Sequence, residues 1–558
     1  MSELIEISKL QNLSDVAHYL GCKPQSLAYT LYHEKNKYTT FEIKKKNGGV
    51  RLINSPCDKL KVLQRILANK LSECLDEIYK ENGGNKISHG FVKNKTIITN
   101  ASEHRNKNLV FNIDLTDFFN TINFGRVRGF FIKNNNFMLN EKVATIFAQI
   151  ACHDGKLPQG SPCSPVISNL ILNILDIRLA KLAFSSNCYY TRYADDLTFS
   201  TNKKVFSKNI VKYRDDGAPE SGPLLTKEIS RSGFIINDKK TRLQFCDSRQ
   251  DVTGLIVNKV VNIPSDYRRL IKAMTHELFC KNSYYIKNAN KKDQKGNLEQ
   301  LNGMLSYIYS VRKNTIHKNI TTRDSKGNPR LDANEKIYSD FLFYRYFVAN
   351  DKPILICEGK TDVAYIKYAI RSRSSRYNSL VEEEYGEKKL KIQVLNSSGQ
   401  VNHLLDLLNG TSSIKKFIEN YSARLKKYEK PLFTNPVIIL TDNDDGSSKL
   451  VPAIKGKYRG SKEINGFHFI TNNLFLIKTP LFPDKPDSKI EDFFTKELLS
   501  RKLNGKTFHP DNDTDNTIHY SKNIFVEEII RKEYKSIDFS GFDEILDLIV
   551  SVIDEYKK

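Results

Sequence analysis

Two short apolar segments of the chain carry acidic residues at positions that constrain the fold. The run 109–113 reads as a β-strand and is followed directly by Asp114. Farther along, the segment 189–200 reads as two strands that flank Asp195 and Asp196, which places this pair in the turn of a hairpin. Carboxylates at a strand end and in a hairpin turn can share two Mg²⁺ ions ~3.5–4 Å apart, the arrangement that phosphoryl transfer to a nucleic-acid 3′ end needs.

The positive charge of the chain is concentrated in its first part. The 558 residues include 87 Lys and Arg against 64 Asp and Glu, a net charge of +23, and almost all of this excess falls before residue 351. Because such a surface repels itself unless a polyanion neutralises it, we expect the first part to bind nucleic acid or an acidic membrane surface. The stretch 312–336 is polar and indicates an interdomain connection. We therefore expect domains at 1–315 and 351–558, joined by a connection at 316–350.

The kinds of segment that the sequence lacks limit where in the cell we expect the protein. No stretch reaches the ~18–20 apolar residues needed to cross a bilayer, and the N-terminal residues do not form a signal peptide. The nine cysteines are scattered and never spaced as Cys-x-x-Cys, so neither a disulfide framework nor a zinc site is expected. These observations predict a protein of the reducing cytoplasm that has no membrane partner.

Four motifs, in order, resemble those of reverse transcriptases. The segments 111–119 and 193–196 resemble the two aspartate motifs of that family, and 157–162, Leu-Pro-Gln-Gly-Ser-Pro, is similar to its nucleotide-positioning loop. The segment 233–241 resembles the part of the palm that supplies a lysine. An isolated Asp pair indicates only a solvated turn, but four motifs in the family's order favour a polymerase.

The resemblance implies an α+β right-hand polymerase, with fingers, palm and thumb, and a role for individual residues. Asp114, Asp195 and Asp196 would bind two catalytic Mg²⁺ ions, with Mn²⁺ as a substitute. Lys240, or alternatively Lys239, would act as general acid toward the leaving pyrophosphate. The residues implied to contact the dNTP are Arg51, Gln159, Gly160 and Phe119, the last as a steric gate against a ribose 2′-OH.

Two further signatures narrow the resemblance to the retron reverse transcriptases of bacteria. The segment 100–104, Asn-Ala-Ser-Glu-His, matches the Asn-Ala-x-x-His signature of retrons, and 252–254 matches their Val-Thr-Gly element. The resemblance covers about residues 20–315. A buried structural role is the alternative for the histidine. The residues thereby implied to serve recognition of structured RNA and local architecture are Asn100, His104, Val252, Thr253 and Gly254.

Residues 351–558 predict an α/β domain. The runs 353–357 and 436–440 are short and continuously apolar, as strands buried on both faces are, and acidic residues follow each. Acids that converge at the ends of adjacent strands repel one another unless a cation compensates, which favours Mg²⁺ or Mn²⁺. The alternative is a Rossmann-like domain whose strand-end acids are incidental.

The acidic motifs of this second domain resemble a Toprim domain, the metal-binding module of topoisomerases, primases and overcoming-lysogenization-defect (OLD) nucleases. The segments 354–362 and 437–444 carry the likeness, and 489–494 and 521–525 are similar to later motifs of the OLD-type nucleases. The metal ligands implied are Glu358, Asp362, Asp442, Asp444 and Glu491. The catalytic residues implied are Glu358, Asp442, Asp444 and Lys522, the last to stabilise phosphorane charge.

Together the resemblances imply a retron reverse transcriptase fused to a nuclease. Such an enzyme copies part of its cognate structured non-coding RNA into branched, RNA-linked multicopy single-stranded DNA, and the nuclease would be the effector of antiphage defence, acting on a nucleic acid that the sequence does not identify. A second copy of the chain is a further candidate partner. The alternatives are a group II intron-type maturase, which should carry a basic maturase segment and often an HNH nuclease, and a Toprim half with a structural or DNA-processing role without toxicity.

Overall fold

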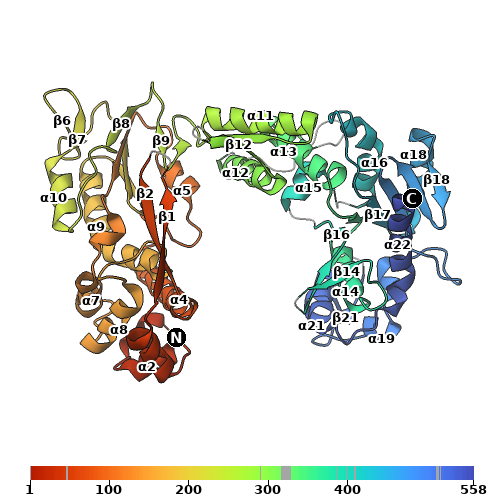
Figure 1. Cartoon of the computed structure of the whole chain (residues 1–558), viewed down its shortest axis with the longest axis horizontal. Coiled ribbons are helices and arrows are strands. Elements are labelled where there is room, and N and C mark those ends of the chain that lie inside the picture. Colours follow the sequence, from red (N-terminus) through yellow and green to blue (C-terminus); the bar gives the residue numbers. More distant parts are fainter. Residues whose placement is uncertain are drawn as a thin grey trace. The chain divides into compact units, whose positions relative to one another are not determined.

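The computed structural model describes residues 2–45, 48–288, 291–315, 329–384, 386–396, 399–407, 410–510, 515 and 517–558. Its contacts divide the chain into two compact units, Met1–Pro264 with Val311–Ile316 and Ser265–Ser310 with His317–Lys558 (Figure 1). This division groups Ser265–Ser310, which the sequence assigns to the first domain, with the C-terminal half. Residues 316–328 of the expected connection lie outside the described residues, and the domain limits 1–315 and 351–558 stay a prediction.

The first unit is built around a four-stranded antiparallel sheet of order β4-β5-β3-β8. Strand β3 (Leu109–Asp114) lies inside the sheet, paired with β5 and β8 along its two edges, and is buried along its whole length. Helix α9 (Cys163–Ser185) packs against β4, and α4 (Asp58–Glu81) packs against α9. The other strands of the sheet are β4 (Tyr189–Tyr193), β5 (Asp196–Thr201) and β8 (Arg242–Phe245).

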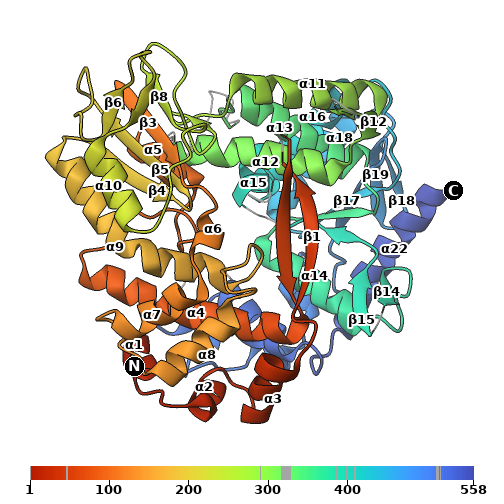
Figure 2. The same cartoon turned by 60° about the vertical axis from the view of Figure 1, so that its left-hand side comes forward.

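Smaller elements surround this sheet. Strands β1 (Tyr38–Lys44) and β2 (Val50–Pro56) form the long hairpin seen clearly in Figure 2, in register from Tyr38 opposite Pro56 to Lys44 opposite Val50. The remaining elements of the unit are α1 (Glu3–Ser8), α2 (Leu13–Tyr19), α3 (Pro24–Ala28), α5 (Ile97–Glu103), α6 (Phe118–Thr121), α7 (Phe124–Lys133), α8 (Glu141–Ala151), β6 (Val211–Tyr213), β7 (Pro219–Ser221), α10 (Pro223–Arg231), β9 (Asp251–Val252) and β10 (Leu255–Ile256).

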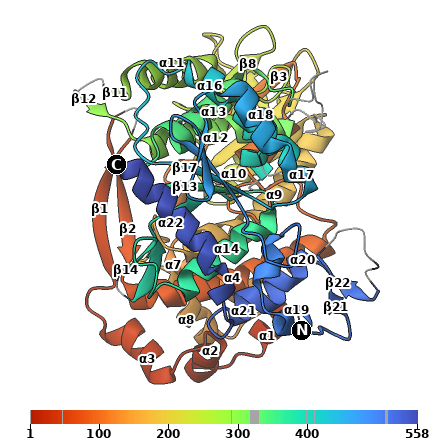
Figure 3. The same ribbon diagram turned by 90° about the vertical axis from the view of Figure 1, so that its right-hand side faces the viewer.

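The second unit contains a six-stranded sheet of order β16-β13-β17-β20-β19-β18. Four neighbouring strands are parallel: β16 (Gln393–Val394), β13 (Ile354–Cys357), β17 (Val437–Thr441) and β20 (Leu474–Lys478). Strand β19 (Phe467–Thr471) is antiparallel to both of its neighbours, β20 and β18 (Lys462–Ile464). The predicted continuous apolar strands are therefore present, and they are buried because helices cover the sheet. Helices α14 (Lys360–Ser372) and α22 (Asp543–Lys557) share one core with alternate residues of β13, β17 and β20 (Figure 3).

The second unit contains further helices and strands. They are α11 (Ser265–Lys281), β11 (Tyr285–Asn288), β12 (Lys291–Lys295), α12 (Leu298–Thr315, which ends in the first unit), α13 (Ala333–Phe343), β14 (Val381–Glu384), β15 (Glu387–Leu390), α15 (Gly399–Leu405), α16 (Thr411–Leu425), α17 (Asp445–Ser448), α18 (Leu450–Lys457), α19 (Lys496–Leu499), β21 (Thr507–Phe508), β22 (His519–Tyr520), α20 (Lys522–Ile524) and α21 (Arg531–Glu533). Within the described part of the chain, no helix is long and apolar enough to cross a membrane.

Candidate active sites

Three carboxylates meet at one end of the sheet of the first unit. Asp114 ends β3 and lies directly opposite Asp196, the first residue of β5. Residues directly opposite in an antiparallel pair have Cβ atoms about 4.5–5.5 Å apart, so these two side chains are neighbours. Asp195 lies in the turn between β4 and β5, and its carbonyl oxygen accepts a hydrogen bond of 3.0 Å from the backbone N–H of Leu115. The predicted acidic cluster is therefore assembled by strand register.

A buried ion pair stabilises the turn that carries Asp195. Arg192 is completely buried, and its Nη2 and Nε atoms donate to the Asp176 carboxylate at 2.7–3.1 Å. Its Nη1 atom donates to the carbonyl of Ala194 at 3.2 Å. Ala194 has a φ of 55°, a left-handed conformation that costs a non-glycine residue energy. Arg192 therefore ties the strained turn to helix α9.

We predict that Asp176→Ala destabilises the fold. The substitution would leave the Arg192 guanidinium buried without its counter-ion, which costs about 3–5 kcal/mol in the free energy of unfolding. Urea denaturation measures the loss. The control is Asp215→Ala, which removes an exposed carboxylate of the same unit and should change stability by less than about 0.5 kcal/mol. Equal stability of the two variants would contradict a structural role for the pair.

The electrostatics of the cluster favour a bound cation. Partial removal from water, together with the charges of Asp195 and Asp114, raises the pKa of Asp196 to about 7. Desolvation also raises the pKa of Asp195. The Lys240 ammonium lies 2.7 Å from Asp114 Oδ2, and the side-chain amide of Asn237 donates to Asp114 Oδ1 at 3.1 Å. The structure thus brings Lys240, rather than its exposed neighbour Lys239, to the acids.

The predicted nucleotide-positioning loop packs on the β1–β2 hairpin. The backbone N–H of Asn54 donates to the carbonyl of Gln159 at 2.8 Å. Gly160 has a φ of 117°, and a Cβ atom there would lie 2.7 Å from the Asn54 carbonyl oxygen, so only glycine fits. The positive charge of Arg51, on the same hairpin, opposes the rise in the pKa of Asp195. The hairpin and the loop are therefore in contact, and the charge of Arg51 acts on the Asp195 carboxylate.

Comparisons with known proteins concern this first part of the chain. Residues 43–258 match the family model described as "Reverse transcriptase (RNA-dependent DNA polymerase)". The retron Ec86 reverse transcriptase of Escherichia coli is 32% identical over 328 residues, which cover 58% of this chain and 92% of that relative. The chain belongs to the retron reverse transcriptases.

Two relatives from Myxococcus xanthus support the same assignment. The retron Mx65 reverse transcriptase is 30% identical over 56% of this chain and 71% of its own length. The retron Mx162 reverse transcriptase is 31% identical over 54% of this chain and 64% of its own length. The prediction that this chain is a retron reverse transcriptase with a polymerase fold is confirmed. Each match leaves a large part of this chain outside it, so the C-terminal half has to be interpreted from its own residues.

The retron Asn-Ala-x-x-His signature lies inside the fold. Asn100 and His104 are both completely buried. The ring of His104 bonds to Ser200 Oγ and Thr191 Oγ1 at 2.7 Å each, and Thr191 donates to Asn100 Oδ1 at 2.6 Å. Burial lowers the pKa of His104 to about 3, so the ring is neutral. This burial supports a structural role, because the two side chains connect α5 to the sheet. RNA recognition by Asn100 and His104 stays a prediction.

The Val-Thr-Gly element of this retron reverse transcriptase lies beside the acidic cluster of the first unit. Val252 is buried, while Thr253 and Gly254 form a turn between β9 and β10 with φ values of 46° and 80°. The Thr253 hydroxyl donates to the carbonyl of Ile97, in α5, at 3.2 Å. Thr253 and Gly254 line a cavity of about 320 Å³ together with Ile97, Asn112, Ile113, Asp114, Tyr193, Asp196, Thr198, Lys240 and Arg242.

The steric-gate residue proposed by resemblance, Phe119, is the second residue of helix α6. The ring of Phe119 is half-buried and packs against Phe118, with ring centroids 5.0 Å apart, and against Phe91, at 6.4 Å. Its neighbour Phe118 is buried and stacks on Phe234, which fixes the helix. The Phe119 side chain is therefore partly exposed on a helix that its packing holds in place, as a steric gate requires.

Removing the Phe119 ring should relax sugar selection. We expect Phe119→Ala to raise incorporation of ribonucleotides relative to deoxyribonucleotides by about 10–100-fold, because a hydrophobic pocket discriminates one extra group by steric fit. Primer extension with each nucleotide class measures the ratio. Phe91→Ala removes the neighbouring exposed ring and should leave the ratio unchanged. An unchanged ratio in Phe119→Ala would refute the gate.

A second acidic cluster lies at the edge of the parallel sheet in the second unit. Strands β13 and β17 are parallel neighbours, so Glu358 and Asp442, which follow them, lie at the same edge. The Thr411 hydroxyl donates to Glu358 Oε1 at 2.5 Å, whereas Glu358 Oε2 is buried without a partner in the described part of the chain. A cavity of about 490 Å³ opens there, lined by Glu358, Gly359, Lys360, Thr361, Asp362, Gly410, Asp442, Pro510, Lys522 and Asn523.

The other predicted residues of this cluster have different surroundings. Asp362 caps α14, since its Oδ2 accepts the Gly359 N–H at 2.7 Å. The buried Glu491 pairs with the Lys522 ammonium at 2.8 Å. Asp444 caps α17 through a bond of 3.0 Å from the Ser447 N–H and does not line the cavity. The structure therefore brings Glu358, Asp362, Asp442 and Lys522 to one cavity. Glu491 is paired with Lys522, and Asp444 caps α17.

The carboxylates of this cavity repel one another, as those of the first site do. Burial, with the charges of Asp362 and Glu491, raises the pKa of Asp442 to about 7, and burial raises the pKa of Glu358 and Glu491. Unpartnered buried carboxylate oxygens suit a divalent cation. In the part of the chain that the structure describes, however, no three His, Cys, Asp or Glu side chains are arranged to hold a metal ion as they stand. Metal binding at either cluster stays a prediction and requires ligand side chains to turn.

The sequence motifs did not single out several residues at these sites. Asn112 and Asn237 lie inside the quoted segments 111–119 and 233–241, but the resemblance gave them no role. Arg242 lines the cavity beside Asp114 because β8, which it begins, pairs with β3. Thr411 begins a helix more than fifty residues from Glu358, and nothing in the sequence indicates that contact.

Proposed function

We propose that the first part of the chain copies a cognate structured non-coding RNA into branched, RNA-linked multicopy single-stranded DNA, using dNTPs. The observation that carries this proposal is the strand register that sets Asp114 opposite Asp196, with Asp195 in the adjoining turn. The retron family assignment gives the template class. The cationic excess before residue 351 supports RNA binding, since polyanion affinity depends on Lys and Arg charge.

In the proposed reaction, a primer hydroxyl attacks the α-phosphorus of the dNTP. The first primer is a guanosine 2′-OH of the RNA, and later ones are DNA 3′-OH groups. A new oxygen–phosphorus bond forms, the bond to the β-phosphate bridge oxygen breaks, and pyrophosphate leaves. Mg²⁺ held by Asp114, Asp195 and Asp196 would supply the positive charge that this transfer needs. Lys240, beside Asp114, would give a proton to pyrophosphate, while Arg51, Gln159 and Gly160 hold the nucleotide.

The retron signatures are proposed to serve RNA recognition by different means. Thr253 and Gly254 line the cavity beside Asp114, so they would contact the RNA or its growing product. Asn100 and His104 would act through the position of α5, whose Ile97 carbonyl accepts the Thr253 hydroxyl. Val252 would anchor the turn from the interior.

We further propose that residues 351–558 form a Toprim-type nuclease that is the effector of antiphage defence. The cavity that joins Glu358, Asp362, Asp442 and Lys522 supports this proposal. Water would attack a phosphodiester phosphorus, one ester oxygen would leave, and Lys522 would stabilise the charge on the phosphorane. Mg²⁺ or Mn²⁺ bound by these acids, with Glu491 and a reoriented Asp444, would activate the water. A structural or DNA-processing role without toxicity is the alternative.

The synthesis proposal is tested on the nucleic acid that accompanies the protein in the bacterial cytoplasm, its proposed location. Chain and cognate RNA are expressed together, and the co-purified nucleic acid is run on a denaturing gel before and after RNase treatment. We expect a DNA band that shifts on RNase treatment and keeps a 2′-linked ribonucleotide. DNA with no attached RNA would contradict branched synthesis. Light scattering of the same sample tests whether a second copy of the chain is a partner.

A further inference from the structure

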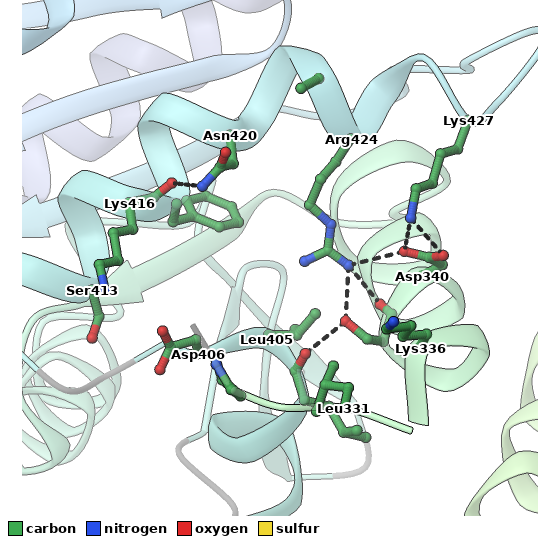
Figure 4. A pocket seen from close by; sticks show the side chains of 15 residues that line it. Leu331, Lys336, Asp340, Leu405, Asp406, Ser413, Lys416, Asn420, Arg424 and Lys427 are labelled. Atoms are coloured by element: carbon green, nitrogen blue, oxygen red, sulfur yellow. Dashed lines mark hydrogen bonds and ion pairs between the residues drawn. The ribbon is translucent and has the colours of Figure 1, made fainter. Parts of the chain in front are cut away.

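A second cavity of the C-terminal unit lies apart from the acids of the proposed nuclease site. It has a volume of about 560 Å³ and opens between α13, α15 and α16 (Figure 4). One stripe of α16, from Ser413 through Phe417 to Arg424, forms one wall. Cavities of this size hold small organic molecules, whereas a single inorganic ion would leave most of the space unfilled.

The charge of this cavity is positive. Its lining contains four cationic side chains against two acidic ones. Asp340 is already satisfied, because both its oxygens accept from the Lys427 ammonium at 2.7 Å. Lys336, one turn before Asp340 on α13, has no partner for its ammonium among the residues that the structure describes. An anionic ligand would therefore be attracted to the end of the cavity where Lys336 and Arg424 lie.

Arg424 is held in place for binding. Its Nη2 atom donates to the carbonyl and hydroxyl oxygens of Ser339, at 3.0 and 2.9 Å, and to Asp340 Oδ1 at 3.4 Å. Its guanidinium carbon lies 4.3 Å from the centre of the Phe343 ring. Nη1 and Nε have no partner in the described part of the chain, and Figure 4 shows the guanidinium directed into the open space. A fixed guanidinium with free N–H groups is suited to a phosphate oxygen.

The rest of the lining suits a flat, partly apolar group. Leu404, Leu405 and Phe417 are buried and offer apolar surface to the cavity. Asn420 donates from Nδ2 to the carbonyl of Lys416 at 2.9 Å, which leaves its Oδ1 available to accept a hydrogen bond from a ligand. An apolar floor with one amide acceptor and a cationic end is the arrangement that a base and its phosphate require.

We propose that this cavity binds a phosphorylated nucleoside, with the phosphate at Arg424 and Lys336 and the base over Phe417 and Leu405. Such molecules are the substrates of the chain's own polymerase, so the protein meets them wherever it acts. Helix α16 also begins at Thr411, whose hydroxyl bonds to Glu358. The ligand would therefore lie on the helix that contacts the proposed nuclease site, although its binding does not depend on that function.

Calorimetric titration of the full chain tests the proposal. The titration is done in EDTA without RNA or primer, so that neither proposed metal site contributes. We expect saturable binding of dATP or ATP that is at least tenfold weaker in Lys336→Gln. Lys415→Gln removes the same charge from α16 outside the cavity lining and should bind as the wild type does. Thermal melting verifies that both variants are folded.

Five results would overturn the proposal. Absence of nucleotide binding, or equal binding by the two variants, would remove the site. Inorganic phosphate that binds as tightly as ATP would show that no base is recognised, and adenosine that binds as tightly would show that no phosphate is. Binding of a short oligonucleotide that Lys336→Gln weakens, without binding of ATP itself, would assign the cavity to nucleic acid instead.

Discussion

Replacing Asp195 and Asp196 together with Asn is expected to abolish DNA synthesis on the cognate RNA. The substitutions keep the size of both side chains but remove the two charges that would hold catalytic Mg²⁺, a loss of about 4 kcal/mol or more of transition-state stabilisation, roughly 1,000-fold in rate. RNA binding should persist, because it depends on basic and shape contacts elsewhere. Incorporation of labelled dNTP and a filter-binding assay on the same preparation measure the two properties.

The chain offers a matched control for this experiment. Asp215 and Asp216 are also adjacent aspartates, but both are exposed and lie in the turn between β6 and β7. Their replacement by Asn changes the net charge equally and should leave synthesis within about twofold of the wild type. Synthesis retained by the Asp195 and Asp196 variant, or lost equally in the control, would reject the assigned acids.

Replacing Glu358 with Gln is expected to remove the proposed nuclease activity and spare DNA synthesis. Glu358 Oε2 is buried without a partner in the described chain and borders the cavity, so an amide there would neither bind a cation nor leave the repulsion with Asp442 intact. Phage protection and growth arrest should disappear, while branched DNA accumulates as before. Plaque counts and a denaturing gel on the same cells make the comparison.

Glu382→Gln is the control for that variant, because Glu382 is an exposed carboxylate on β14 of the same unit. It should protect cells fully. Full protection by Glu358→Gln, with branched DNA present, would show that the second acidic cluster is not the effector site. Loss of branched DNA in Glu358→Gln would contradict the independence of the two sites.

Features encoded by local pattern and motif were predictable from the sequence. The strand before Asp114, the hairpin around Asp195 and the buried parallel strands before Glu358 and Asp442 all occur where the apolar patterns placed them. Motif order gave the family without any knowledge of contacts. Strand pairing then fixes which acids meet, and this pairing follows once the strands and their order are known.

Features that depend on packing between distant segments were not predictable. The pairing of Arg192 with Asp176 joins a strand to the helix before it, and both residues would pass as surface charges in the sequence. Asn100 and His104 appear polar enough for an RNA surface, yet Thr191 and Ser200 satisfy them in the interior. Asp444 resembles a metal ligand, but the start of α17 uses it as a cap. In each case the partner, rather than the residue, decides the role.

We propose that the chain holds two independent acidic clusters that bind divalent cations. Equilibrium binding of Mn²⁺, followed by electron paramagnetic resonance of the free ion, tests it directly on the wild type, on the Asp195 and Asp196 double Asn variant, and on Glu358→Gln. We predict that each variant loses one class of sites while the other class keeps its affinity. Binding unchanged in both variants, or lost from both classes at once in either, would contradict two separate metal centres.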